Sequence, residues 1–299
     1  MIGDGLSGSF GVSGIEPPRP QSMEVVLLGT AGGPIPSARR GAPAQAIVHG
    51  KDVYIVDCGN GVARQMVRAG LSLADLRAIF LTHHHADHMI DIGALPFLAW
   101  ADGLSTPVDL IGPPPLRCVL NHFLAMIDVD LRARQCTTGR PRFDSLLRVR
   151  EIEGAGVVWD HNGLEVRFCI VDHPPLRSAL AFRFQTADRC VVISGDTRYS
   201  SELVELARGA DVLVHEAYHG ETVDKVSSTS NAPTLREHII ACHTEVHEVS
   251  KVAHHAGVGL LVLSHLVPAD GAIDDETWVA AATSEFDGPV VVGRDFQTI

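Results

Sequence analysis

The chain has 299 residues, 45% of them hydrophobic, and its 24 basic and 36 acidic residues give a formal net charge of −12 at pH 7. Such a chain can bury a substantial core, whereas its acidic balance argues against a protein that grips nucleic acid through many phosphate contacts. No apolar run approaches the roughly eighteen residues of a membrane helix. The six cysteines form no C-x-x-C pair, so a disulfide framework is not indicated and a cytoplasmic location is favoured.

The hydrophobic pattern predicts a flexible arm followed by alternating strands and helices. Residues 1–22 are rich in Gly, Ser and Pro, which is typical of a flexible arm. The first predicted elements of residues 23–299 are strands 24–29, 44–49, 52–57, 78–82 and 107–111 and helices 61–70, 89–100 and 115–127. A loop or lid is expected at 128–145. The later predicted elements are strands 146–152, 164–171, 179–185, 189–194, 211–216, 259–264 and 289–293 and helices 200–208, 244–256 and 274–285. No linker separates the two halves, so we expect one α/β domain, a four-layer αββα sandwich.

The segment between strand 78–82 and helix 89–100 is the most informative part of the chain. It reads His83-His84-His85-Ala86-Asp87-His88. Side chains two residues apart share a face of an extended chain, so His83 and His85 point the same way, and Asp87 and His88 follow in the turn. Imidazole nitrogens and a carboxylate at H-x-H-x-D-H spacing can hold two adjacent cations, of which zinc suits them best and manganese or iron(II) are alternatives.

Three further donors follow apolar runs later in the sequence. His173, Asp196 and His265 each stand at the end of a predicted strand and before a turn. Strand ends can converge on one edge of a sheet sandwich. His173 or His265 alone would more often be a hydrogen-bonded structural histidine, but as a set these residues favour a metal site over a polar cluster.

At these residues the sequence resembles the metallo-β-lactamase fold hydrolases, and within them the ribonuclease Z-like group. The resemblance covers roughly residues 24–293 and includes LLGTAGG at 27–33, VDCG at 56–59, VHEA at 214–217 and CHT at 242–244. A closer likeness to the chlorothalonil hydrolytic dehalogenase branch is carried by VDHPP at 171–175, EHIIACHT at 237–244 and HLVPAD at 265–270.

The resemblance implies a four-layer metallo-β-lactamase sandwich and a role for each donor. Three histidines would hold the first metal, a carboxylate and two histidines the second, and one carboxylate would bridge: His83, His85 and His173; Asp87, His88 and His265; and Asp196. Two zinc ions about 4 Å apart would lower the pKa of a shared water toward 7. The resemblance also gives Asp87 a second role as proton acceptor.

His243 is the catalytic candidate outside the ligand set. The resemblance implies that it stabilises the transition state or protonates the leaving group, and an exposed histidine beside a helix cap is the alternative. A zinc-peptidase motif with His247 is rejected, because Thr244 stands where that motif needs Glu. Asp57 and Glu216 are the best candidates to orient the ligands, although a purely structural carboxylate remains the alternative for each.

The main expectation for function is a dinuclear zinc hydrolase that uses a metal-bridging hydroxide on a small aromatic or activated substrate. An ester, a lactone, an aryl sulfate or an aryl halide such as chlorothalonil would qualify. The alternative is a ribonuclease Z-like tRNA 3′-processing endonuclease, and a metal-bearing protein without activity is the weakest reading. The 22 residues between His173 and Asp196 leave no room for the tRNA-binding arm of many ribonuclease Z proteins. We therefore expect a small-molecule substrate, with nucleic acid disfavoured as a partner but not excluded, no membrane, and a homodimer as the likeness implies.

Overall fold

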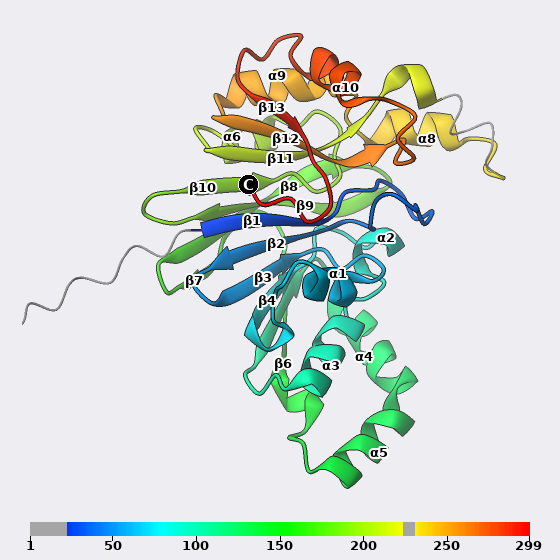
Figure 1. Ribbon diagram of the computed structural model, residues 1–299, viewed down its shortest axis with the longest axis vertical. Helices are drawn as coiled ribbons and strands as arrows, with labels where there is room; N and C mark the ends of the chain where they lie inside the picture. Colours follow the sequence, from blue (N-terminus) through cyan, green and yellow to red (C-terminus); the bar gives the residue numbers. More distant parts are fainter. Residues whose placement is uncertain (1–22, 224–230) are drawn as a thin grey trace, which may run out of the picture.

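The computed structural model describes residues 23–223 and 231–299. The predicted arm at 1–22 lies outside these ranges, as does part of the segment before His243. No helix of the described ranges is long and apolar enough to cross a membrane. Two mixed β-sheets lie face to face, and helices cover the outer face of each (Figure 1). The fold class predicted from the sequence, an α/β four-layer sandwich, is confirmed.

The first sheet follows the order of the chain. Its six strands are β1 (Met23–Gly29), β2 (Ala44–His49), β3 (Asp52–Val56), β4 (Leu76–Phe80), β5 (Val108–Gly112) and β6 (Leu147–Glu151). The pairs β1–β2 and β2–β3 are antiparallel, and the pairs from β3 to β6 are parallel. The predicted strand at 146–152 therefore belongs to this sheet and not to the second half of the sandwich.

The second sheet has seven strands in the reverse order, from β13 to β7. They are β7 (Gly156–His161), β8 (Leu164–His173), β9 (Leu176–Gln185), β10 (Cys190–Ile193), β11 (Val212–Tyr218), β12 (Leu260–Val267) and β13 (Val290–Val292). Strands β7 to β10 form an antiparallel meander, and β10 to β13 are parallel. Strand β7 has no counterpart among the predicted elements.

Helices cover the outer faces of both sheets. The described α-helices are α1 (Val62–Arg68), α2 (Ala86–Met89), α3 (Ala94–Asp102), α4 (Leu116–Met126), α5 (Asp128–Thr138), α6 (Ser201–Leu206), α8 (Leu235–Cys242), α9 (Val246–Ala256) and α10 (Asp275–Ala282). Short 3₁₀ turns occur at Leu73–Asp75, Phe143–Leu146 and Gly220–Thr222. Apolar side chains of α1, α3 and α4 pack on the first sheet, and those of α6, α9 and α10 pack on the second.

The core between the sheets is centred on Phe80 of β4. Its ring meets Phe182 and Phe184 of β9 edge-on, with ring centroids 5.4 and 5.3 Å apart. Its neighbour Ile79 faces the helices on the other side of the sheet. Strand β4 is therefore buried on both faces, which explains its nearly continuous apolar sequence and anchors the polar segment that follows it.

The expectation of a loop or lid at 128–145 is wrong, because most of this segment forms helix α5. Exposed charge pairs one turn apart support the helix: Asp128 with Arg132 at 2.8 Å and Asp130 with Arg134 at 2.7 Å. Thr138 hydrogen-bonds its hydroxyl to the carbonyl of Arg134. The polar composition that resembled a loop is therefore that of a solvated helix, which extends away from the sheets with α4 (Figure 1).

Candidate metal centre

The candidate ligands come from strand ends at one edge of the sandwich. The segment after β4 carries His83 and His85, His173 is the last residue of β8, and Asp196 follows β10. His265 lies within β12 at a register shift against β11, with φ at 45°. Such a bulge re-aims a side chain, and here it brings His265 to the same edge.

The first donor group is formed by three histidines and one carboxylate. Nδ1 of His85 lies 3.1 Å from Nε2 of His83 and 3.1 Å from Nε2 of His173. Oδ2 of Asp196 lies 3.7 and 4.0 Å from the same nitrogens of His83 and His173. These spacings match donors around one tetrahedral ion, which binds imidazole nitrogen at about 2.0–2.1 Å if it is zinc.

The second donor group shares Asp196 with the first. Its Oδ2 lies 3.2 Å from Nε2 of His88 and 3.3 Å from Nε2 of His265. Oδ2 of Asp87 lies 3.5 Å from each of these nitrogens. One carboxylate oxygen of Asp196 therefore faces both groups, which is the position of a bridging ligand between two cations.

Unsatisfied buried atoms support the fit of this donor set to cations. Within the described ranges, Nε2 of His88, the nitrogen that faces Asp87 and Asp196, is buried without a hydrogen-bond partner, and so is the second oxygen of Asp196, Oδ1. Buried polar atoms without partners are costly in a folded protein. The donor set is nitrogen and oxygen only, so the residues present fit two divalent ions such as zinc.

Hydrogen bonds fix which nitrogen of two histidines faces the centre. His173 donates Nδ1–H to the backbone carbonyl of Cys242 at 2.7 Å, which leaves Nε2 as a donor for a metal. His88 bonds through Nδ1 to Oδ2 of Asp57 at 2.7 Å, with the same consequence. Asp57 therefore lies where a carboxylate that orients a ligand is needed.

Thr82, which the sequence analysis did not consider, links Asp57 to His83. Its backbone N–H donates to Oδ1 of Asp57 at 2.8 Å and its hydroxyl donates to the same carboxylate at 2.9–3.0 Å. The hydroxyl oxygen lies 2.9 Å from Nδ1 of His83 and can accept its proton. One carboxylate thus orients His88 directly and His83 through a hydroxyl. In the sequence, the only signal for Thr82 was its position between an apolar run and the histidine motif.

Burial keeps the histidines of the first group neutral. It lowers the pKa of His83 well below 6.5, lowers that of His85 to about 4, and also lowers that of His173. Neighbouring imidazoles lower these pKa values further. Neutral imidazole is the form that binds metals, so these side chains are ready to do so without losing a proton.

Carboxylates dominate the electrostatics of the second group. Burial alone would lower the pKa of His88, but Asp196 and Asp57 raise it well above 6.5. Burial would raise the pKa of Asp87, whereas its contacts with His265 and His88 lower it to about 2. Positive charge is therefore stabilised at this position, as a site for a cation requires.

His243 follows α8 and lies beside both donor groups. Its Nδ1 is 3.1 Å from Oε1 of Glu216 and 3.9 Å from Oδ2 of Asp196, and its ring stacks on that of His265. Burial opposes its charge, but Glu216 raises the pKa of His243 well above 6.5. Glu216 also accepts the N–H of Thr244 at 3.0 Å, so it holds both the ring and the backbone at this point.

The other histidines near the motif divide into two kinds. His84 points away from the centre and bonds through Nε2 to the carbonyl of Pro113 at 2.8 Å. His238 lies on α8 with its ring centroid 6.3 Å from that of His85 and 6.4 Å from that of His243. In the sequence, the only signal that His238 lies near the centre was its spacing of one helical turn to Cys242.

A family model and two ribonucleases match most of the chain. Residues 24–259 match the family model described as "Anti-Pycsar protein Apyc1". Ribonuclease Z of Mycobacterium sp. (strain KMS) is 35% identical over 280 residues, which cover 93% of this chain and 95% of that protein. Ribonuclease Z of Mycobacterium tuberculosis (strain ATCC 25177 / H37Ra) is 35% identical over 283 residues, 93% of this chain and 97% of that protein.

Two solved structures share the fold at lower identity. The metallo-β-lactamase fold protein YhfI from Bacillus subtilis is 21% identical with a TM-score of 0.68, and the match covers 93% of this chain and 99% of that one. The short form of human tRNase Z is 20% identical with a TM-score of 0.67, and the match covers 92% and 98%.

These relatives correct two expectations from the sequence. The expectation of a small-molecule hydrolase as the main function is wrong, and so is the expectation against a nucleic-acid partner. Relatives of about 35% identity over nearly the whole chain are ribonucleases by name. The physical reason is that net charge is a sum over the whole surface. It says nothing about charge at one edge, where two divalent ions, if bound, would add about four positive charges.

Proposed function

Because the chain belongs to the ribonuclease Z-like group of metallo-β-lactamase fold hydrolases, we propose that it is a tRNA 3′-processing endonuclease. The observation that carries the proposal is the shared oxygen of Asp196 between two donor groups, with His243 beside it. Paired cations and a nearby proton donor are the arrangement expected for hydrolysis of a phosphodiester.

In this proposal the seven donors hold two cations, which we expect to be zinc. The first cation would be held by three histidines, the second by a carboxylate and two histidines, and Asp196 would contact both: His83, His85 and His173; Asp87, His88 and His265. When bound, such a pair lowers the pKa of a water molecule and neutralises charge on a phosphodiester.

The protein groups supply orientation and proton transfer. Asp57 and Thr82 hold His88 and His83 with the correct nitrogen toward the centre. Asp87, whose pKa of about 2 keeps it ionised, can accept a proton from the attacking water. His243 bonds through Nδ1 to Glu216, which leaves Nε2 to donate a proton to the leaving oxygen of the RNA strand.

The RNA must be positioned without an inserted arm. Strands β9 and β10 account for most of the 22 residues between His173 and Asp196. Residues 174–175 form the only connection between β8 and β9. Surfaces elsewhere on the chain would therefore have to hold the tRNA.

Cleavage of a precursor tRNA tests the proposal. Zinc-loaded protein should cut a precursor labelled on its 3′ trailer at one site beside the acceptor stem, and His265→Ala should abolish the cut. Hydrolysis of bis(p-nitrophenyl) phosphate without any cleavage of the precursor would reject the endonuclease. An anti-Pycsar role, named by the match over residues 24–259, would then become the leading candidate.

Four narrower predictions accompany this function. Zinc as the metal, a homodimer and a cytoplasmic location stay predictions from the sequence and its family resemblance. The closer likeness to the dehalogenase branch stays a prediction about ancestry, and we propose no dehalogenase activity from it.

A further inference from the structure

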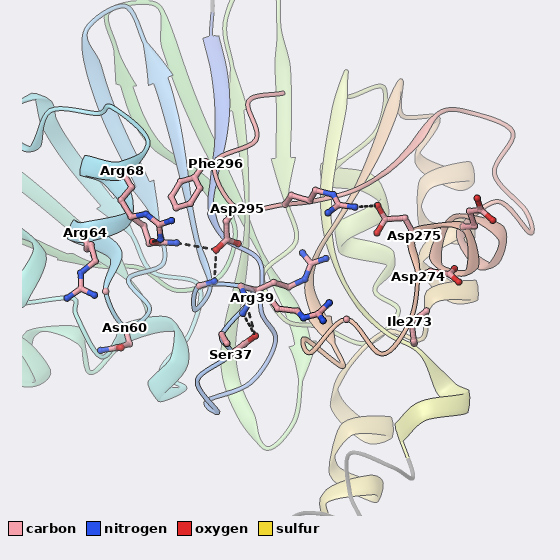
Figure 2. A pocket seen from close by; sticks show the side chains of 18 residues that line it. Ser37, Arg39, Asn60, Arg64, Arg68, Ile273, Asp274, Asp275, Asp295 and Phe296 are labelled. Atoms are coloured by element: carbon pink, nitrogen blue, oxygen red, sulfur yellow. Dashed lines mark hydrogen bonds and ion pairs between the residues drawn. The ribbon is translucent and has the colours of Figure 1, made fainter.

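An arginine-lined pocket of about 960 Å³ lies outside the candidate metal centre and shares none of its seven donors. Four segments line it, at residues 37–41, 60–68, 271–276 and 294–296. In Figure 2, Arg64 and Arg68 lie at one end of this pocket, Asp274 and Asp275 lie at the other end, and Arg39 lies between them. Its five arginines are a large share of the 24 basic residues of an acidic chain.

The walls of the pocket continue directly from the centre. Gly33 donates its N–H to Nε2 of His265 at 3.4 Å, and the chain then runs to Arg39 in the pocket wall. Cys58 donates its N–H to the carbonyl of His88 at 2.6 Å, and the pocket-lining residues begin two positions later. The segments that form two walls of the pocket are therefore the same segments that contact His265 and His88.

Of the four carboxylates that line the pocket, Asp295, Asp275 and Asp274 are engaged, Asp274 by accepting the N–H of Thr277 at 2.8 Å, whereas Glu276 makes no side-chain bond within the described ranges. Both oxygens of Asp295 accept hydrogen bonds, from Thr30 at 2.8 and 3.1 Å and from Gly41 at 2.5 Å. Asp275 pairs with Arg294 at 2.5 Å. These bonds hold the segments together, so these carboxylates have little capacity left to neutralise further cations.

Two arginines of the pocket remain without such partners. Within the described ranges, the guanidinium groups of Arg39 and Arg64 make no hydrogen bond or ion pair, and both side chains are exposed. Arg68 lies over the ring of Phe296, 4.5 Å from its centroid, and bonds only to Gln65 at 3.2 Å.

We infer that this pocket binds backbone phosphates of the RNA substrate away from the cleaved bond, one through Arg39 and another through Arg64. The inference rests on the proposed function. Guanidinium groups bind phosphate oxygens in pairs, and unpaired ones need not first give up a protein partner. Contacts of this kind position a strand without reading its sequence, which is the task that the missing arm leaves open.

The test compares tRNA binding and cleavage in matched variants. Arg39→Ala/Arg64→Ala is set against Arg167→Ala/Arg208→Ala, which removes two exposed charges that pair with Glu165 and Glu205 elsewhere. Fluorescence anisotropy with mature tRNA measures binding without cleavage. The pocket variant should raise Kd about tenfold and reduce the slope of log affinity against log salt by about one per arginine. On precursor tRNA it should raise KM more than it lowers kcat.

Lysine substitutions and metal content separate the inference from misfolding. Arg39→Lys/Arg64→Lys should restore part of the affinity, because the charge remains while the paired donors are lost. The control pair should bind tRNA like the wild type. A pocket variant that folds and holds its metal but binds tRNA as tightly as the control pair would overturn the inference.

The remaining outcomes separate this inference from the proposed function and from a free anion. Arginine-dependent tRNA binding without cleavage of any precursor would keep the pocket and reject the endonuclease. Cleavage of the precursor with an unchanged KM in the pocket variant would keep the endonuclease and reject the role of the pocket. Calorimetry with inorganic phosphate that shows saturable binding dependent on Arg39 and Arg64, with unchanged tRNA affinity in the variant, would assign the pocket to a free anion and reject the RNA contact.

Discussion

Nδ1 of His88 lies 2.7 Å from Oδ2 of Asp57, and this contact turns Nε2 of the same ring toward Asp87 and Asp196. The two residues are 31 positions apart and meet because β3 and β4 are parallel neighbours in the first sheet. Asp57 takes φ of 63°, a conformation that Asp and Asn tolerate better than most residues. The backbone is thus bent to present the carboxylate to the histidine.

Asp57→Asn should weaken metal binding without unfolding the protein. The amide fits the same backbone conformation but loses the negative charge that orients His88 and, through Thr82, His83. Loss of such a contact typically costs a factor of about 10–100 in metal affinity. A chelator competition titration measures this, with Asp52→Asn at the far end of the same strand as control. Wild-type affinity in Asp57→Asn would show that the carboxylate only supports the backbone.

Metal content should follow the two donor groups. The wild type should bind two zinc ions per chain, His173→Ala and His265→Ala about one each, and Asp196→Ala should lose affinity at both sites. Inductively coupled plasma mass spectrometry after dialysis counts them, with the exposed His254→Ala as control. Two ions retained by both single variants would contradict the division into groups.

Removing the metal should also lower stability. A ligand present at a hundredfold excess over its Kd stabilises the folded state by about 2.7 kcal/mol. Chelation should therefore lower Tm in the wild type, and the shift should be smaller in Asp196→Ala, which has less bound metal to lose. Calorimetry with and without EDTA checks this. An equal shift in both proteins would mean that the chelator acts elsewhere.

His243→Ala should reduce kcat for precursor tRNA by about 10²–10⁴, the range for loss of a proton donor, at unchanged metal content. Glu216→Gln should have a smaller effect, because it only holds and charges the ring. His247→Ala, an exposed histidine on α9, is the matched control and should be active. Loss of a metal ion in His243→Ala would make this residue a ligand, as its distance to Asp196 would permit.

Thiol reactivity should divide the cysteines by burial. Cys118 and Cys136 are exposed on α4 and α5, and the other four are buried. Burial raises the pKa of Cys169 to about 12 and that of Cys190 to about 11, so neither forms appreciable thiolate at pH 8. Titration with a disulfide reagent should show two fast thiols in the native protein and six in denaturant. Cys118→Ser/Cys136→Ser should show no fast thiol, and one that remained would place a buried cysteine in an open region.

The donors of the H-x-H-x-D-H segment could be predicted because they are close in the chain. Strand geometry alone places His83 and His85 on one face. His173 and Asp196 were recognisable because each follows a strand, and strand ends meet at a sheet edge. The prediction for segment 128–145 was wrong, because its polar composition is typical of a loop. The Asp–Arg pairs that support α5 are recognisable only when their spacing of four residues is read as one helical turn.

The sequence by itself determined the sandwich, the donor types and the order of the strands that carry them. Only the tertiary structure decided which carboxylate serves which histidine, because the pairing of Asp57 with His88 depends on the register of β3 and β4. The same holds for Arg39 and Arg64, which come from different segments and line one pocket although the chain is acidic. Composition adds charges without regard to position, whereas folding brings distant segments together and decides which arginines keep a partner.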